Sequence, residues 1–112
     1  MTRPEDQLQI AVAKLLDLHG LTWFHPPNEA KRSMFTAKLM KDKGMKAGVP
    51  DVLIFDNFGE FAGTAIELKI GYRKQTDTQI EWECKLRKCK WSYHVCRSID
   101  EVIQVLKTNY GK

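Results

Sequence analysis

Apolar residues near the start of the chain recur with the period of a helix. They predict an amphipathic helix over residues 3–19, whose apolar face is formed by Leu8, Val12, Leu15 and Leu16. Thr2 and Glu5 have the spacing of a capping box at the start of this helix, and Gly20 suits a left-handed cap at its end. The next apolar stretch, residues 21–25, predicts a short strand that ends before a pair of prolines.

The middle of the chain contains a polar segment followed by two apolar ones. Residues 28–48 are polar and basic, which predicts a loop around a short helix near residues 33–40. Residues 49–55 include four consecutive apolar residues, the pattern of a strand buried on both faces. A turn at residues 56–59 then predicts a hairpin with a return strand over residues 61–70.

Two further capping boxes mark helices in the last part of the chain. Thr76 and Gln79 predict a helix after the hairpin, and residues 91–96 predict another strand. Ser98 and Glu101 begin a last helix, whose apolar face is formed by Ile99, Val102, Ile103 and Leu106. Apart from the short helix in the basic loop, the order is α-β-β-β-α-β-α, which predicts an α/β fold with a mixed central sheet flanked by helices.

Length and composition are those of one globular domain. The chain has 112 residues, which suits a single domain over residues 1–112. Its apolar fraction of 43% and charged fraction of 29% exclude a wholly disordered protein. No apolar run approaches the roughly 20 residues of a membrane span, and the N-terminus does not resemble a signal peptide. Cys84, Cys89 and Cys96 form no C-x-x-C pair, so we expect small buried side chains in a reducing cytoplasm.

The net charge of +4 is unevenly distributed along the chain. Residues 31–46 carry six basic residues and one acidic residue, and residues 84–97 carry five basic residues and no acidic one. The remainder of the chain is therefore acidic. Two basic segments on an acidic chain are typical of a protein that binds a polyanion such as nucleic acid, although solvated helix faces would produce the same pattern.

The residues with the clearest chemistry lie on the two strands of the predicted hairpin. Glu67 and Lys69 are two positions apart, so their side chains share a face, while Leu68 points to the other face. If the strands pair through their turn, Asp51 lies alongside Glu67. Two carboxylates with a backbone carbonyl between them form a hard oxygen site for Mg²⁺ or Mn²⁺, and a neighbouring lysine can hold a water or neutralise charge on a phosphate. The alternative is a surface salt bridge between Glu67 and Lys69.

The order of these residues resembles the PD-(D/E)xK nuclease superfamily, and within it the virus-type replication-repair nuclease (VRR-NUC) family in its small stand-alone phage form. Six stretches, which span nearly the whole chain, carry the resemblance: Glu5 with Gln9, His25-Pro26-Pro27-Asn28-Glu29, Lys46-Ala47-Gly48-Val49-Pro50-Asp51, Ile66-Glu67-Leu68-Lys69, Thr78-Gln79 and Val95-Cys96-Arg97-Ser98. One departure is Lys88-Cys89-Lys90, where the family often has a glycine. This departure changes a turn and leaves the chemistry intact.

The resemblance implies a restriction-endonuclease-like fold and metal-dependent hydrolysis of phosphodiester bonds in DNA. It implies Asp51 and Glu67 as ligands of Mg²⁺ or Mn²⁺, with help from the Leu68 backbone carbonyl. It also implies that Lys69 is the catalytic lysine. These roles agree with the chemistry expected from the residues themselves.

Residues around this centre have roles that the resemblance suggests less directly. Glu5 is a candidate further ligand, because Glu5 and Gln9 share one helix face. Gln79 is expected to organise the active site through Lys69 or a phosphate. Contacts with DNA are expected from His25, Asn28, Lys46, Arg73 and Lys74.

Small members of the family are dimeric and resemble Holliday-junction resolvases in their assembly. The expected form is therefore a homodimer that cleaves branched DNA, either as a phage protein in a bacterial host or in the bacterial cytoplasm. A two-fold dimer would hold two sites at a fixed spacing. Trp82, Leu86 and Cys89 recur at helical spacing and are expected in the core or at the dimer interface. The alternatives are a monomeric flap or nicking nuclease, and an inactive DNA-binding module, against which the intact catalytic residues argue.

Overall fold

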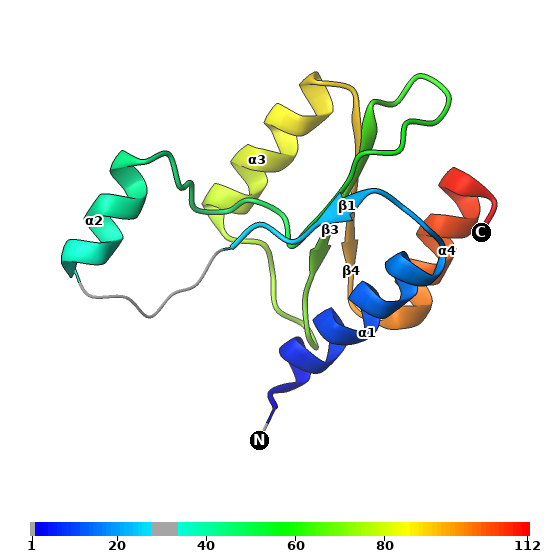
Figure 1. Ribbon diagram of the computed structural model, residues 1–112, viewed down its shortest axis with the longest axis horizontal. Coiled ribbons are helices and arrows are strands. Elements are labelled where there is room, and N and C mark those ends of the chain that lie inside the picture. Colours follow the sequence, from blue (N-terminus) through cyan, green and yellow to red (C-terminus); the bar gives the residue numbers. More distant parts are fainter. Residues whose placement is uncertain (1, 28–33) are drawn as a thin grey trace.

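The computed structural model describes residues 2–27 and 34–112, and in these ranges it contains four helices and a four-stranded sheet (Figure 1). Along the chain the elements are α1 (Pro4–Leu18), β1 (Trp23–Phe24), α2 (Met34–Asp42), β2 (Val52–Ile54), β3 (Gly63–Leu68), α3 (Asp77–Lys88), β4 (Trp91–Cys96) and α4 (Ile99–Tyr110). The strands lie in the order β1-β2-β3-β4, and only the β3–β4 pair is parallel among them. The predicted mixed sheet flanked by helices is confirmed.

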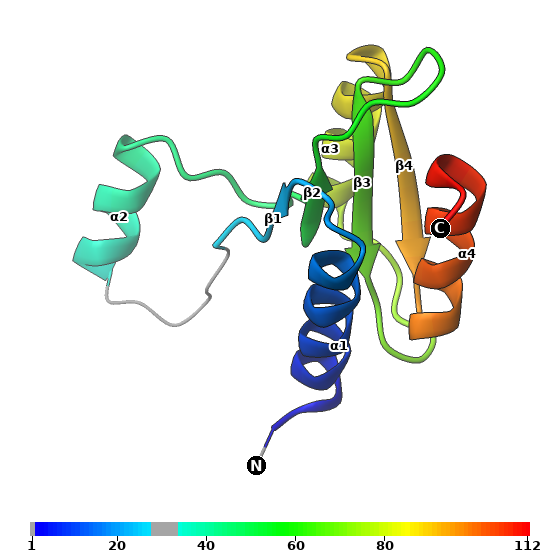
Figure 2. The ribbon, with the colours of Figure 1, turned by 45° about the vertical axis from the view of Figure 1, so that its right-hand side comes forward.

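Apolar residues of α1, α4 and one face of the sheet form the core. The fully buried members are at most 1% exposed: Val12, Leu16, Val52, Ile54, Ile66, Cys96, Val102 and Leu106. The apolar face predicted for the first helix is confirmed, since Leu8 and Leu15 pack against this cluster. On the opposite side of the sheet, α3 packs against β4 (Figure 2). In the described ranges, no helix is long and apolar enough to cross a membrane.

The β2–β3 hairpin brings the two predicted carboxylates together. Val52 pairs with Ile66 in antiparallel register, so the same register places Asp51 beside Glu67. Side chains of β3 alternate between the faces: Thr64 contacts Tyr110 of α4, whereas Glu67 contacts α3. The hairpin and the opposed direction of neighbouring side chains are confirmed.

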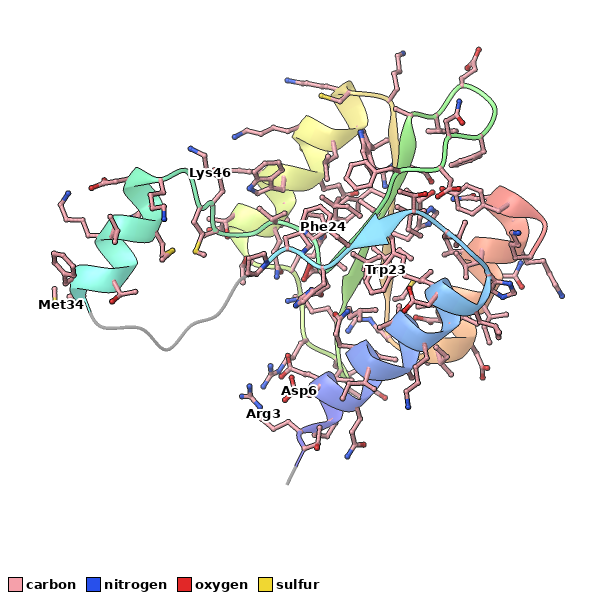
Figure 3. The ribbon with its side chains drawn as sticks, viewed as in Figure 1. Arg3, Asp6, Trp23, Phe24, Met34 and Lys46 are labelled. Carbon is pink, nitrogen blue, oxygen red and sulfur yellow. The ribbon has the colours of Figure 1, made fainter. Side chains whose placement is uncertain are left out.

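The helix α2 stands apart from the rest of the fold (Figures 1 and 2). It has no buried residue, and its first two residues, Met34 and Phe35, are 90% and 79% exposed. Figure 3 shows Met34 at the outer end of this helix. The short helix expected in the basic loop therefore forms, but it adds nothing to the core of the described residues.

One of the three predicted capping boxes forms in full. The Thr76 hydroxyl accepts from the Gln79 backbone N–H, and the Gln79 side chain accepts from the Thr76 backbone N–H. Ser98 likewise caps α4 by accepting from the Glu101 N–H. The Glu101 carboxylate, however, bonds the backbone N–H of Arg97 rather than that of Ser98.

The capping box predicted at Thr2 is wrong. Arg3 is the N-cap residue of α1 and makes no side-chain capping bond, while Pro4 occupies the first turn. Proline suits this position because the first helical N–H groups have no partner within the helix. Glu5 is consequently free of a capping role, and its carboxylate pairs with Arg73.

The surfaces of α3 and α4 correct two further expectations. Cys84 and Cys89 are exposed free thiols, and only Cys96 is buried. Trp82 and Leu86 are among the half-buried positions of α3, on the side that faces the sheet, and Cys84 lies off this side. Cys89 is exposed because it is the C-cap residue, beyond the last turn of α3. In α4, Ile103 is 39% exposed. It directly follows the buried Val102, and successive side chains of a helix point about 100° apart, so Ile103 lies at the margin of the apolar face.

Candidate active site

A cleft of about 250 Å³ opens where the start of α1 meets the hairpin and the start of α3. Four carboxylates, one lysine and one histidine are among its lining residues, which are Glu5, Asp6, Gln9, His25, Asp51, Glu67, Leu68, Lys69 and Gln79. A chain with a net charge of +4 thus has a markedly acidic cleft. Such a surface attracts cations.

Asp51 and Glu67 are held in place at the bottom of this site by different elements. The Asp51 carboxylate accepts a hydrogen bond of 2.8 Å from the Leu68 backbone N–H. Glu67 is 3% exposed, and its Oε1 accepts a bond of 3.0 Å from the Gln79 side-chain amide. Its other oxygen, Oε2, is buried and has no hydrogen-bond partner among the described residues. A buried carboxylate oxygen without a partner is unfavourable unless something else binds it.

The electrostatics of the pair disfavour two ionised carboxylates side by side. Burial and the neighbouring charge of Asp51 raise the pKa of Glu67 to about 9, against the opposing effect of Lys69. Within residues 2–27 and 34–112, no salt bridge involves Asp51 or Glu67. A cation between the two carboxylates would favour the ionised form of both.

The donor set fits Mg²⁺ or Mn²⁺. In the part of the chain that the structure describes, no three His, Cys, Asp or Glu side chains converge as a complete metal cage. Mg²⁺ does not require one, because it usually keeps several waters and takes one or two carboxylates together with substrate oxygens. Asp51, Glu67 and the Leu68 carbonyl offer oxygen donors of this kind.

Lys69 and Gln79 complete the centre. Lys69 lines the cleft two positions after Glu67, and its backbone N–H donates to the Cys96 carbonyl at 3.0 Å, so the strand is held as far as this residue. Gln79 uses its amide oxygen to cap α3 and its amide nitrogen to hold Glu67. Its partner in the structure is therefore Glu67, whereas Lys69 or a phosphate was predicted.

A close backbone contact sets the position of α3 beside the hairpin. Gly48 has a left-handed φ of +85°, and a Cβ added there would lie 2.5 Å from the carbonyl carbon of Thr78. Only glycine allows the segment before β2 to approach the first turn of α3 so closely. This turn carries Gln79, so the contact fixes the distance from Gln79 to the hairpin.

A known structure shares this arrangement over almost its whole length. The solved structure of a VRR_NUC domain protein matches with a TM-score of 0.81 and 28% sequence identity, and covers 99% of this chain and 91% of that one. The chain has the VRR-NUC fold. This likeness supports a nuclease-type function. No protein-family model matches the chain, and no curated protein does.

His25 is the only predicted DNA contact that also lines the cleft of this VRR-NUC fold, among the described residues. Its Nδ1 lies 2.6 Å from the Asp51 carbonyl oxygen. Since a carbonyl only accepts, Nδ1 carries the proton and Nε2 is the nitrogen left for other partners. Asn28 lies outside the described residues. Lys46 and Lys74 are exposed and lie outside the cleft lining.

The first turn of α1 supplies the outer carboxylates. Glu5 lines the cleft as expected and forms a salt bridge of 3.1 Å with Arg73. Asp6 also lines the cleft and pairs with Arg3 at 3.6 Å, as the labelled side chains in Figure 3 show at the start of the helix. Sequence reasoning missed Asp6, because an acidic residue in a first turn is common and carries no further signal.

The second basic segment divides between two ends of the molecule. Arg97 follows β4 at the same end as Lys69 and donates to the Gly71 carbonyl at 2.9 Å. Lys85 and Lys88 lie on the last turns of α3, at the opposite end of that helix from Gln79. Since a helix rises about 1.5 Å per residue, Lys85 and Lys88 lie about 9 Å and about 14 Å along the helix axis from Gln79.

Proposed function

We propose that the protein is a Mg²⁺- or Mn²⁺-dependent deoxyribonuclease. The observation that carries this proposal is the buried, unpartnered Oε2 of Glu67 beside Asp51 in an acidic cleft. A bound Mg²⁺ or Mn²⁺ would act as a Lewis acid on a phosphate oxygen and lower the pKa of its water. Asp51, Glu67 and the Leu68 carbonyl would hold the ion.

The remaining residues of the cleft would position the reactants. Lys69 would hold the attacking water or neutralise the charge that develops on the phosphate. Gln79 would keep the Glu67 carboxylate in one orientation, because its own side chain is fixed by the helix cap. Glu5 would serve as a further oxygen donor, and His25 would approach the DNA at the edge of the site.

We further propose a homodimer that acts on branched DNA in the bacterial cytoplasm, where a phage or a bacterium would use it. Exposed aromatic residues support the dimer. Phe24 of β1 and Phe55, which directly follows β2, are 45% and 48% exposed, and their rings stack with centroids 5.9 Å apart. The exposed free thiols of Cys84 and Cys89 support a reducing compartment.

The nuclease proposal is tested with four end-labelled DNAs: a duplex, a flap, a splayed arm and a four-way junction. We expect cleavage with Mg²⁺ or Mn²⁺ and none with EDTA, with the junction cut fastest. Preference for the flap would favour a flap nuclease. DNA binding without cleavage of any substrate would identify an inactive DNA-binding module.

The dimer proposal is tested by light scattering with two matched variants. Phe55→Glu should give a folded monomer with reduced junction cleavage. Phe61→Glu alters an aromatic residue of similar exposure, 42%, in the hairpin turn and should stay dimeric. A monomeric wild-type protein that cuts junctions on paired strands would contradict the dimer.

A further inference from the structure

Two of the four carboxylates around the cleft are held by arginines, and two are not. Arg73 holds Glu5, and Arg3 holds Asp6, whereas Asp51 and Glu67 have no such partner in the described ranges. Glu5 lines the cleft, but Arg73 lies outside the lining. The salt bridge therefore draws a potential oxygen donor toward the rim of the site.

We infer that Arg73 and Glu5 form an exchangeable latch that couples metal loading to DNA binding. This inference rests on the proposed nuclease function. In the free protein, Arg73 forms a salt bridge with Glu5. When a DNA phosphate binds Arg73 in its place, the Glu5 carboxylate is released and turns toward the cation held by Asp51 and Glu67. Arg73 is then a positioning residue that responds to substrate.

The salt bridge between Arg73 and Glu5 is open to exchange because both side chains are exposed. The side chains of Arg73 and Glu5 are 69% and 48% exposed, and an exposed ion pair shifts an equilibrium by no more than about fivefold. A phosphate accepts two parallel N–H bonds from a guanidinium, which makes it a strong competitor for Arg73. The loop itself is held, because Arg97 binds the Gly71 carbonyl and the Arg73 N–H donates to Ile70.

The metal side of the latch is tested by Mn²⁺ binding to the free protein, measured by electron paramagnetic resonance. Arg73→Ala should raise Mn²⁺ affinity by roughly twofold to fivefold, since it frees Glu5. The same change in a Glu5→Gln background should have no effect. Lys74→Ala is the matched control, because it removes a neighbouring positive charge that has no part in the latch.

The DNA side is tested by fluorescence anisotropy of a labelled duplex in EDTA. Glu5→Gln should tighten binding by roughly twofold to fivefold, because it frees Arg73 for a phosphate. In an Arg73→Ala background, Glu5→Gln should change the affinity no more than Asp17→Asn, the removal of an acid outside the cleft.

Distinct outcomes separate the latch from the nuclease proposal. If Asp51→Asn abolishes Mn²⁺ binding but Arg73→Ala matches Lys74→Ala, the latch is overturned and the metal site stands. The latch is also overturned if the Arg73→Ala gain persists without Glu5, since it then reflects general electrostatics. If the wild-type protein shows no Mn²⁺ binding that depends on Asp51, both proposals are wrong.

Discussion

The Gln79 side chain holds Glu67 through its amide nitrogen, at 3.0 Å, while its amide oxygen caps the helix on which it lies, at 2.8 Å. The two bonds use both ends of one amide, so its orientation is determined. A helix terminus is thereby joined directly to a buried carboxylate of the cleft. Structural and functional roles of Gln79 can be separated by choosing which end of the amide is removed.

Gln79→Ala should lower the free energy of unfolding by about 1 kcal/mol, through the lost cap, and should slow cleavage. Gln79→Glu keeps an oxygen for the cap but loses the N–H donor to Glu67. We expect Gln79→Glu to recover the stability in urea denaturation without recovering the rate. Wild-type cleavage by Gln79→Glu would show that the bond to Glu67 is unimportant.

Asp51→Asn or Glu67→Gln should lower the cleavage rate by at least about a hundredfold, because the Lewis acid supplies several kcal/mol of transition-state stabilisation. Binding of duplex DNA in EDTA should remain, since it depends on the basic surface. Circular dichroism checks that both variants are folded. A Mg²⁺-dependent rate close to that of the wild type in either variant would refute the assignment of these ligands.

The raised pKa of Glu67 makes the stability of the metal-free protein depend on pH. The folded state retains a proton up to a pKa of about 9, whereas the unfolded chain releases it near its ordinary value. Between the ordinary pKa of 4.5 and the raised pKa of about 9, the free energy of unfolding should therefore be greatest at the low-pH end and fall as pH rises. Thermal unfolding in EDTA should show this slope, which Glu67→Gln flattens. An unchanged slope in Glu67→Gln would mean that another group titrates.

Lys69→Ala should lose most activity even at saturating metal, and Lys69→Arg should not restore it. Arginine keeps the positive charge, but its planar guanidinium stays protonated and does not match the shape of an ammonium group. Single-turnover cleavage at saturating DNA measures the step concerned. Full activity of Lys69→Arg would reduce the lysine to a source of general electrostatic attraction.

Basic residues that precede α3 and a basic residue at its end can be compared by charge reversal. Lys46→Glu or Lys74→Glu should weaken binding of every DNA substrate, with base preference unchanged, because phosphate contacts carry no sequence information. Each lost contact should reduce the slope of log affinity against log salt by about 0.9. Lys88→Glu, at the end of α3, serves as the comparison. An equal loss of DNA affinity in all three variants would mean that the DNA contact extends to the end of α3 that carries Lys88.

The pairing of Asp51 with Glu67 could be predicted from the sequence only as a possibility of the hairpin, because the turn predicted at residues 56–59 lies instead at residues 59–60, between Phe58 and Phe61. The capping box at Thr76 was equally local, and its spacing predicted the start of α3 within one residue. Contacts of this kind depend on residues close in the chain. Local patterns therefore predicted the centre of the candidate site.

The outer residues of the site could not be predicted in this way. Glu5 and Arg73 are 68 positions apart, and both have long exposed side chains whose pairing leaves no periodic signal. The helical spacing of Trp82, Leu86 and Cys89 indicated the side of α3 that faces the sheet, but not that Cys89 lies at the C-cap, where no element covers it. Packing between distant elements decided each of these features.

Because Gly48 and Thr78 are in close contact, a substitution outside the cleft lining would disturb the geometry of the cleft. Alanine at position 48 would bring a methyl group to 2.5 Å from a backbone atom and demand an unfavourable φ of +85°. The first turn of α3 would have to retreat, and Gln79 would move with it. The bond by which Gln79 holds Glu67 thus depends on the absence of a single side chain, at a position outside the cleft lining.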